Sequence, residues 1–499
     1  MLIDKCTRII HILFLAVAIW VSIIIFATSV KKYTLFIIAA VLLIYIGYYF
    51  LRGKMGTLIN IHQFLKVEKY FFYILLLLAF IFMIIIAFAL RVDVYGTWDY
   101  GQLIRTAYEY VTEGQFSNTE YYARYPNNSF YLLVLSLYFK LIHPLAGENI
   151  YNYINATIPV NCILVMSSII FCYIAAREFV NERAALKCGF IMLGMSPLYL
   201  YATIAYTDVF AIFPVSLLLF SYAKIKYEQI ILKKMLWLCL AALVTAVGYK
   251  IKATLIIFFI AIVMDLFFAI LKKNEKITLL IVYISVFCIS VSICTTISKN
   301  FLYHNGVTQE MMLQEEFPVT HWLMMSLNPQ HDGGFNQEDV DYTKSHLGKE
   351  EKTDANINLI KERVADMGIV GTMEHIFVKK VIRMWGAGDC SASDYVSRQP
   401  LSENIIREFF ALNGQYNYIY RICAQIYYIL VILAVLKVAI IVVVRKKMFI
   451  KSFMLELVFL GVFMFFLIWE CNSRYLFVFL PVLALLISIT EERGKRNAR

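Results

Sequence analysis

The amino-acid sequence predicts an all-α polytopic membrane protein with about twelve transmembrane helices. Of its 499 residues, 61% are hydrophobic and 16% are charged, and the mean hydropathy is +0.69. Soluble domains carry roughly 25% charged residues, so this composition excludes disordered chains and soluble nucleic-acid-binding proteins. The further observation is a series of apolar runs of about 20 residues, the length that crosses the hydrocarbon core as a helix.

The apolar runs predict the spans in order along the chain. The first run, 8–30, is longer than the apolar region of a signal peptide and is followed at once by a second run, so we expect it to remain as a span. A shorter run, 130–142, begins just after Pro126 and ends at Pro144, which favours a helix lying at the membrane interface. The expected spans lie near residues 9–30, 33–51, 70–90, 153–175, 187–205, 208–223, 235–249, 252–271, 277–298, 416–444, 452–469 and 474–489.

Lysine and arginine residues predict the orientation. If 130–142 does not cross, both termini and all the basic loops fall on one side; these loops lie around 52–69, 177–187, 224–234, 272–276 and 445–451. Basic loops stay in the cytoplasm. We therefore expect a multi-pass protein of the cell membrane with both termini cytoplasmic. The net charge of +11 is then largely a topology signal, and no nucleic-acid partner is expected.

This topology divides the chain into three parts. Residues 1–298 form an N-terminal transmembrane module, whose first large external loop, 91–152, carries interfacial helices, including an amphipathic helix over 100–113. Residues 299–415 form an extracytoplasmic insertion that is too long for a simple loop and has helical patterns near 354–366 and 371–385. Residues 416–499 supply the last transmembrane helices and a basic cytoplasmic tail.

Asp99 is the first candidate site residue. It follows Trp98 shortly after the third span and opens the amphipathic helix. Aspartate is a preferred helix N-cap, which favours a purely structural role. Alternatively, a carboxylate held at the membrane surface can act as a general base for a hydroxyl acceptor. Asp93 is the competing candidate for that base.

Further charges are expected at the outer ends of other spans. Asp208 lies in a turn too short to be merely solvated, so it should face a cavity or water. Lys250 and Lys252 oppose the cytoplasmic bias of basic residues, and Arg474 follows Glu470 by one helical turn. Snorkelling or a Glu470–Arg474 ion pair would explain single residues. One external cavity that binds an anion would explain them together.

Four motifs contain or adjoin these charges. They are Thr97-Trp98-Asp99, Tyr122-Ala123-Arg124-Tyr125-Pro126-Asn127-Asn128, Tyr206-Thr207-Asp208 and Trp469-Glu470-Cys471-Asn472-Ser473-Arg474-Tyr475. In these motifs, and in layout over nearly the whole chain, the sequence resembles the GT-C superfamily of integral-membrane glycosyltransferases. Within it, the chain is similar to bacterial members related to protein O-mannosyltransferases and aminoarabinose transferases.

The resemblance implies transfer of a sugar from a polyprenyl-phosphate-linked donor, outside the membrane, with inversion at the anomeric carbon. The acceptor would be a hydroxyl of a cell-envelope glycan, lipid or polymer, and Asp99 would be the base. Many relatives carry an Asp-Glu pair where this chain has Asp99 and Tyr100, which leaves a divalent metal cofactor undecided. The insertion resembles no domain for protein acceptors.

The chemistry of a phosphate leaving group agrees with this assignment. Departure of the phosphate builds negative charge that preplaced cations can stabilise, and arginine suits two-point contact with phosphate. Asp208 could orient the Asp99 helix, bind sugar hydroxyls or hold a metal. The full set of expected substrate-binding residues is Arg124, Asp208, Lys250, Lys252, Glu470, Arg474 and Tyr475.

Two other classes of protein remain open. A secondary transporter or lipid flippase predicts ionisable residues near the middle of helices, whereas here nearly all lie at the outer rim. A non-catalytic assembly subunit, or a polymerase or ligase of cell-surface glycans, is the second alternative. It is distinguished by whether Asp99 faces a cavity shared with Arg474.

Overall fold

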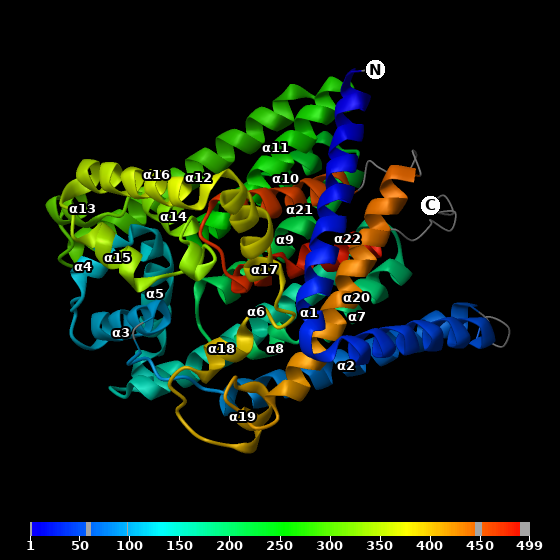
Figure 1. Cartoon of the computed structure of the whole chain (residues 1–499), viewed down its shortest axis with the longest axis horizontal. Coiled ribbons are helices and arrows are strands. Elements are labelled where there is room, and N and C mark those ends of the chain that lie inside the picture. The colour runs from blue at the N-terminus through cyan, green and yellow to red at the C-terminus, as the bar shows by residue number, and fades with distance from the viewer. Residues whose placement is uncertain (1, 56–60, 97, 445–451, 490–499) are drawn as a thin grey trace.

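The computed structural model describes residues 2–55, 61–96, 98–444 and 452–489. Helices dominate these ranges (Figure 1), and the described residues contain one isolated β-bridge but no strand. Thr97, the basic loop 445–451 and the tail after residue 489 lie outside the described residues, as do most side chains of the predicted span 33–51. The all-α polytopic fold that the sequence predicts is therefore the fold observed.

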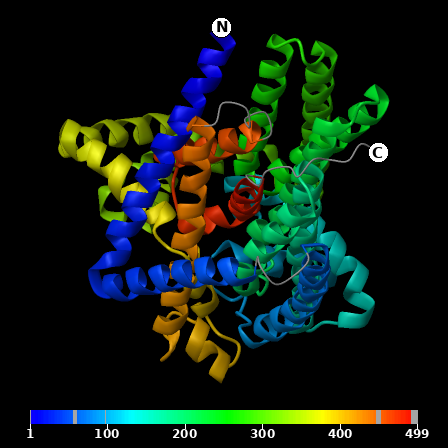
Figure 2. The same ribbon diagram turned by 90° about the vertical axis from the view of Figure 1, so that its right-hand side faces the viewer.

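Nine helical segments of the described ranges are long and apolar enough to cross a membrane. The first, in α1 (Leu2–Met55), is followed by a bend at which the helix changes direction (Figures 1 and 2), consistent with two successive spans. Two shorter apolar helices, Phe453–Ile468 and Ser473–Ser488, complete the C-terminal part. The nine segments are Ile3–Ser29, Lys66–Ala89, Pro126–Ala146, Ile150–Phe179, Thr207–Tyr227, Ile231–Ile251, Ala253–Leu271, Ile277–His304 and Asn417–Val444.

The helices on which the argument below depends have the following bounds. In the transmembrane part they are α2 (Ile61–Ala89), α6 (Ile150–Phe179), α7 (Glu182–Gly194), α8 (Pro197–Tyr201), α9 (Thr207–Tyr227), α10 (Ile231–Ile251), α11 (Ile256–Leu271), α12 (Ile277–His304), α20 (Asn417–Val444), α21 (Phe453–Ile468), η5 (Ser473–Phe479) and α22 (Leu480–Ser488). In the loop 91–152 and the insertion 299–415 they are α3 (Asp99–Thr112), α4 (Thr119–Arg124), η1 (Pro126–Asn128), α5 (Ser129–Ala146), α13 (Gln309–Glu315), α14 (Val319–Ser326), α15 (Gln337–Lys344), α16 (Gly348–Glu374), η4 (His375–Lys379), α17 (Lys380–Trp385), α18 (Ala392–Ser397) and α19 (Ile405–Phe410).

Two predicted spans are not single α-helices. The span expected over 187–205 consists of α7 and α8, which are separated just before Pro197. Proline has no backbone N–H and disfavours helical geometry in the residue before it, so it begins a new helix. The span expected over 474–489 starts as the 3-10 helix η5 and becomes α22 only at Leu480, with a proline in the first turn.

Helix α5 is longer than the 130–142 run from which it was predicted. Its 18 residues continue through Pro144, and η1 precedes it directly, so its length is sufficient for a crossing. Its surroundings favour the expected path instead. Lys69 Nζ at the start of α2 lies 3.0 Å from Glu182 Oε1 just beyond α6. Crossings by α2 and α6 bring the chain back to this end of the bundle, and a third crossing by α5 would separate the two residues.

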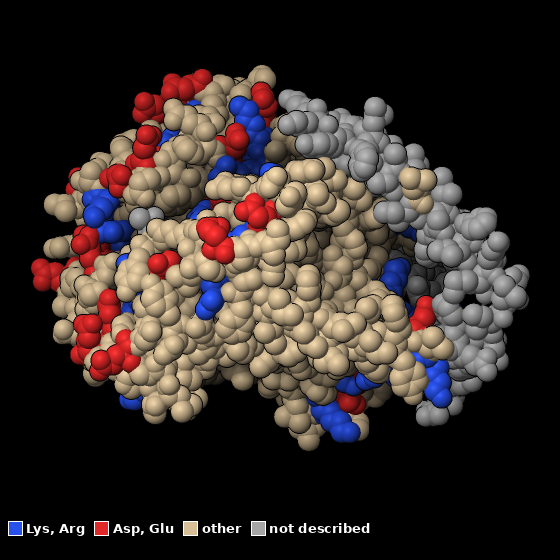
Figure 3. Space-filling view, turned by 90° about the horizontal axis from the view of Figure 1, so that it is seen from below, with Lys and Arg blue, Asp and Glu red and all other residues tan. Residues whose placement is uncertain are grey.

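Ion pairs join the loops that are predicted to be cytoplasmic. Each pair links residues from two of these loops or from the ends of their helices, in agreement with one common side. The pairs are Lys224–Glu178 at 2.9 Å, Lys226–Asp265 at 2.6 Å, Lys234–Glu275 at 2.8 Å and Lys272–Asp4 at 3.7 Å. Seen from below, a broad area between the charged rims carries few charged side chains (Figure 3), as a surface facing lipid requires.

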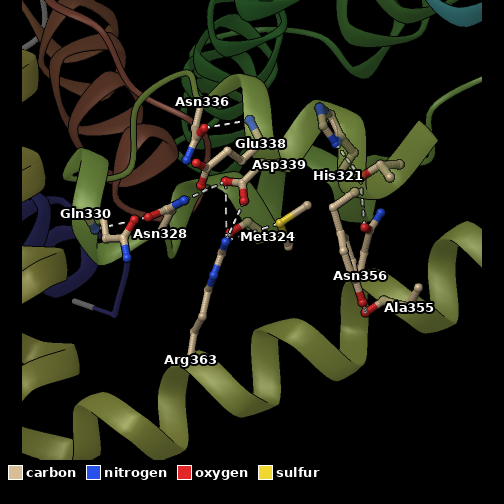
Figure 4. Close-up of polar contacts among 12 residues, drawn as sticks. His321, Met324, Asn328, Gln330, Asn336, Glu338, Asp339, Ala355, Asn356 and Arg363 are labelled. Atoms are coloured by element: carbon tan, nitrogen blue, oxygen red, sulfur yellow. Dashed lines mark hydrogen bonds and ion pairs between the residues drawn. The ribbon is translucent and has the colours of Figure 1, made fainter. Parts of the chain in front are cut away.

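The first half of the insertion, α13 to α16, forms a helical cap. Arg363 on α16 lies 2.5 Å from Asp339 on α15, and Asn328 Nδ2 donates to the same carboxylate at 2.9 Å (Figure 4). On α14, His321 Nδ1 shares a hydrogen bond of 2.8 Å with the hydroxyl of Thr343. These buried polar contacts fix α14, α15 and α16 to one another.

The second half of the insertion, residues 386–411, holds the loop that carries Asp99. Pro400 forms the β-bridge with Val92, and the Asp93 N–H donates to the Gln399 carbonyl at 2.8 Å. The first external loop is thus fixed by a segment about 300 residues further along the chain.

Candidate active site

A cavity of about 710 Å³ lies where the loop 91–152, the adjoining ends of α9 to α11, the insertion and the last hairpin meet. Trp98, His321, Trp322 and Tyr395 form part of its wall. The cavity also collects most of the site residues predicted from the sequence. Those that line it are Asp99, Lys250, Lys252, Glu470, Arg474 and Tyr475.

Asp99 is held by two tyrosines. The Tyr121 hydroxyl donates to Oδ1 and the Tyr206 hydroxyl donates to Oδ2, both at 2.7 Å. Asn128 Nδ2 donates to the Tyr121 oxygen at 2.9 Å and orients that phenol. Burial raises the pKa of Tyr121 and Tyr206 well above the usual value, and the charge of Asp99 adds to the effect. Both phenols therefore stay protonated and keep the carboxylate in one orientation.

The expected N-cap role of Asp99 is not observed. The N-cap of α3 is Trp98, without a side-chain hydrogen bond to the helix, and Asp99 is the first helical residue. A glycine on the same turn allows this placement, because a Cβ on Gly101 would lie 2.2 Å from the Val94 carbonyl oxygen. Only glycine lets α3 sit directly on the preceding loop, which turns Asp99 into the cavity.

Asp208 lies behind the cavity wall and binds two cations. Its side chain is 1% exposed, with Lys252 Nζ 2.6 Å from Oδ1 and Arg474 Nε 3.4 Å from Oδ2. The carboxylate lies in the first turn of α9, where the helix dipole favours negative charge. Burial lowers the pKa of Lys252, and Asp208 opposes that shift. Among the described residues, Asp208 is the carboxylate that forms ion pairs with both cations.

Aromatic rings surround the Arg474 guanidinium. Its central carbon lies 4.6 Å from the ring centre of Tyr395, 4.9 Å from Tyr206 and 5.4 Å from Tyr475. Lys252 Nζ lies 4.7 Å from the same Tyr475 ring. Cation–π contacts of this kind stabilise a desolvated cation and fix the plane of an arginine. Tyr206 therefore links the two halves of the site, because it contacts both Asp99 and Arg474.

The ion pair between Glu470 and Arg474, which the sequence left open as an alternative to an anion site, is not among the contacts of the described residues. Glu470 Oε2 instead accepts a hydrogen bond of 2.7 Å from the Tyr475 hydroxyl. Glu470 and Arg474 do not share a helix, because α21 ends at Ile468 and η5 begins at Ser473. Burial raises the pKa of Glu470.

The remaining predicted residues differ in position. Lys250 lines the cavity, and the structure records no ion pair for it among the described residues. Arg124 lies outside the cavity lining; it pairs with Glu315 at 2.6 Å and also with Glu120. The carboxylate of Asp93, also outside the lining, accepts from the N–H of Val94 at 2.6 Å. In this structure Arg124 fixes α4 to α13, and Asp93 shapes the turn before α3.

A family model described as a conserved hypothetical integral membrane protein matches residues 2–495. The chain belongs to this family. A sequence comparison with curated proteins finds no match.

This member of the conserved hypothetical integral membrane protein family is similar to two kinds of solved structure. One is the archaeal oligosaccharyltransferase AglB from Archaeoglobus fulgidus, in complex with an inhibitory peptide and a dolichol-phosphate, with 16% identity and a TM-score of 0.43 over 85% of this chain. The match covers 50% of AglB, so the chain spans about half the length of that enzyme. The other is ArnT from Cupriavidus metallidurans bound to undecaprenyl phosphate, with 10% identity and a TM-score of 0.36 over 84% of this chain and 78% of ArnT.

The residues present do not fit a divalent-metal site. The described residues include no group of three or more His, Cys, Asp and Glu side chains that could hold a metal ion. The oxygens of Asp99 face phenol hydroxyls, and those of Asp208 face a lysine and an arginine. Asp99 and Asp208 therefore face different sets of partners and do not share a space in which a metal ion could bind both. No step is assigned to a metal.

One residue that the sequence analysis did not identify holds the end of α21 next to the site. Lys380 on α17 is 1% exposed, and its Nζ donates to the carbonyl oxygens of Leu467 and Trp469, each at 2.9 Å, and to the Ser326 hydroxyl. Its ammonium group therefore caps the C-terminus of α21, immediately before Glu470. Burial lowers the pKa of Lys380 to about 8.

Other residues that the sequence analysis did not identify lie on the cavity wall or, like Tyr121, beside it. Tyr121 and Asn128 adjoin or belong to a motif that the sequence offers, but neither the contact of Tyr121 with Asp99 nor that of Asn128 with Tyr121 could be inferred from spacing. Tyr395 and Arg398 lie in the insertion, where no motif marks them. The Arg398 guanidinium pairs with Asp394 at 2.6 Å and lies over the Tyr395 ring at 4.1 Å.

Proposed function

We propose that the protein is a membrane glycosyltransferase that moves a sugar from a polyprenyl-phosphate-linked donor to a hydroxyl of an extracytoplasmic acceptor. One observation carries this proposal: the Asp99 carboxylate and the Lys252–Arg474 cation pair line the same cavity from different hairpins. A base for the acceptor and a site for the phosphate are the two groups that such a transfer needs.

The acceptor hydroxyl binds beside Asp99. Its oxygen forms the new bond to the anomeric carbon as its proton passes to the Asp99 carboxylate. The bond between the anomeric carbon and the phosphate oxygen breaks, and its electron pair leaves with the polyprenyl phosphate. Attack opposite to the leaving group inverts the configuration. The tyrosine hydrogen bonds hold the carboxylate where it can take the proton without first reorienting.

The cations stabilise the leaving phosphate. Within the described part of the chain, Asp208 is the one carboxylate that forms an ion pair with Lys252 or Arg474, so these two cations retain attraction for a second anion. Because the guanidinium is fixed by three rings, its free N–H groups present a preorganised surface. Lys250 adds a third cation on the same wall. Glu470 and Tyr475 hold the turn on which Arg474 lies.

The extracytoplasmic position of this cavity is part of the proposal. The ion pairs that join the basic loops lie at the opposite ends of the helices that line the cavity; Lys224, for example, ends the helix that begins beside Asp208. The apolar lining residues Phe466 and Trp469 suit the polyprenyl end of the donor.

The test uses the full chain in liposomes with radiolabelled undecaprenyl-phosphate hexose as donor and a cell-envelope fraction as acceptor. We expect release of free undecaprenyl phosphate together with labelled acceptor, and loss of both products in Asp99→Asn. Movement of intact donor across the bilayer with no cleavage would contradict the proposal and identify a flippase. Asp93→Asn serves as the control for a nearby carboxylate.

A further inference from the structure

Residues 369–385 connect the cap to the second half of the insertion. At Gly368, just before this segment, the composition of the chain changes from charged to mostly apolar. Helix α16 is charged along its first part, up to Asp366. Gly368 then adopts φ 62°, ψ 179°, which breaks the helix into two segments at a kink. Beyond it, the only acidic residue of the segment is Glu374, and the next charged residue is Lys379.

The segment after the kink exposes a stripe of large apolar side chains. Ile369 and Val370 are each 82% exposed, Met373 is 52% exposed and Phe377 is 40% exposed. Ile369, Met373 and Phe377 follow one another at intervals of four residues, so they share one helical face. An exposed apolar face of this kind marks a surface that contacts lipid or another protein.

Contacts with α1 give the depth of this stripe. The Trp20 indole N–H donates to the Phe377 carbonyl at 2.8 Å. Trp20 lies nine residues before Ser29, the end of the apolar stretch of α1, a distance of about 14 Å at roughly 1.5 Å per residue. Its neighbours Ile19 and Ile23 are exposed on the bundle surface. The Phe377 carbonyl, in the π-helical turn η4, is thus satisfied by a side chain at the level of the hydrocarbon core.

The following residues continue into the bundle. Val381, Met384 and Trp385 are buried, and the Trp385 ring lies 5.3 Å from that of Phe459, in the middle of α21. Figures 1 and 2 show the chain passing from α16 to α17 beside α1. The stripe therefore lies between a charged cap and a helix that packs among the transmembrane helices.

We propose that residues 369–377 insert among the acyl chains of the lipid leaflet on the side of the cap. The apolar stripe continues the lipid-facing surface of α1, and the charged part of α16 stays above it in the headgroup region and water. The insertion is then a membrane-embedded element that enters the bilayer from the outside and returns. This inference concerns membrane contact alone and does not depend on glycosyl transfer.

The experiment uses the full chain in liposomes that contain phospholipid with a diazirine on the acyl chain. After illumination, lipid adducts are mapped by peptide mass spectrometry. We expect adducts within 369–377 and on the α1 surface around Ile19 and Ile23. The internal control is Leu347, a 74% exposed apolar residue before α16, which should carry none. Labelled α1 with unlabelled 369–377 would overturn the proposal.

A second measurement separates lipid from a protein partner. We expect Ile369→Asp with Val370→Asp to lower the unfolding temperature in liposomes, whereas Leu347→Asp should not change it. If a second protein covers the stripe, residues 369–377 would escape the lipid label in native membranes but take it up after purification. That difference would overturn the proposal, and equal labelling in both preparations would support it.

Discussion

Asp99 and Tyr206 form the contact on which the proposed chemistry depends. The phenol is fixed by Arg474 on one side and donates to the carboxylate on the other. A proton acceptor positioned in this way contributes typically 10²- to 10⁴-fold to a rate. We expect Asp99→Asn to lower transfer by about that factor, because the amide keeps the size of the side chain but cannot take a proton.

The measurement is the turnover of donor by purified protein, with the folded fraction checked by size-exclusion chromatography. Asp93→Asn is the matched control, since that carboxylate holds only its own turn. Near-normal turnover in Asp99→Asn would leave the residue a structural partner of the two tyrosines.

Arg474 permits a test of the anion site. Replacement by lysine keeps the charge but loses the planar group that lies between three rings. We expect Arg474→Lys to weaken undecaprenyl phosphate binding by about 1.5–3 kcal/mol, roughly ten- to a hundredfold. Glu470→Gln should change it less, because Glu470 binds Tyr475 and not the guanidinium. Equal affinities in wild type and both variants would move the phosphate site to Lys250 and Lys252.

Among the elements, α17 connects the cap to the last hairpin through Lys380. The charged ammonium supplies three donors, and these meet the Ser326 hydroxyl and the carbonyls of Leu467 and Trp469. With a pKa of about 8, the group loses its proton as pH rises through 8. We expect transfer to decline there in wild type, and Lys380→Arg to shift the decline to higher pH.

Stability should move in the opposite direction to activity. Because the folded-state pKa lies below the ordinary 10.5, the unfolded chain binds more protons between about pH 8 and 10.5, and this group's contribution to stability rises with pH across that range. Unfolding temperature and transfer rate measured over the same pH series would separate a positioning role from a merely structural one. Lys379→Met is the control, and parallel declines in rate and stability would contradict the assignment.

The cap should loosen in acid because of His321. Burial lowers the pKa of this imidazole from 6.5 to about 4, although Asp339 opposes the shift. As pH falls from about 6.5 to 4, His321 becomes protonated in the unfolded chain but stays neutral in the folded cap. The cap therefore loses stability over that pH range. The loss should be on the order of 3 kcal/mol. Hydrogen exchange in α15 and α16 should rise in wild type but change much less in His321→Gln; identical profiles would exclude the histidine.

Hydropathy predicts the helices that face lipid. It does not predict helix breaks caused by proline or contacts that depend on tertiary packing. The helix observed at Asn417–Val444 agrees with the expected 416–444 because its apolar run is uninterrupted. Pro197 breaks a span that hydropathy cannot distinguish from its neighbours, whereas Pro144 is tolerated in the last turn of α5. The cavity was predictable as a cluster of charges at the outer rim. The partners of Asp99 were not, because tertiary contact alone brings Tyr121 and Tyr206 to it.

At the scale of the whole molecule, the orientation in the membrane stays a prediction with a direct test. Reporter fusions at positions 180 and 340 should report opposite sides of the membrane, with 180 in the cytoplasm, because the chain around 180 pairs with the basic start of α2. A fusion at 115, before α5, should agree with 340. Reporters at 180 and 340 on the same side would invalidate the topology and the outward position of the site.

Residues 386–411 fix the loop that carries Asp99, and they are synthesised long after it. The Asp99 carboxylate is made about 300 residues before the backbone that fixes its loop and the ring of Tyr395, and about 375 residues before the guanidinium on η5. Asp208 is likewise made before Lys252 and long before Arg474, the two cations that pair with it. A nascent chain therefore lacks the complete proposed centre until the hairpin that carries Arg474 has been made, so we expect no transfer activity from shorter nascent chains.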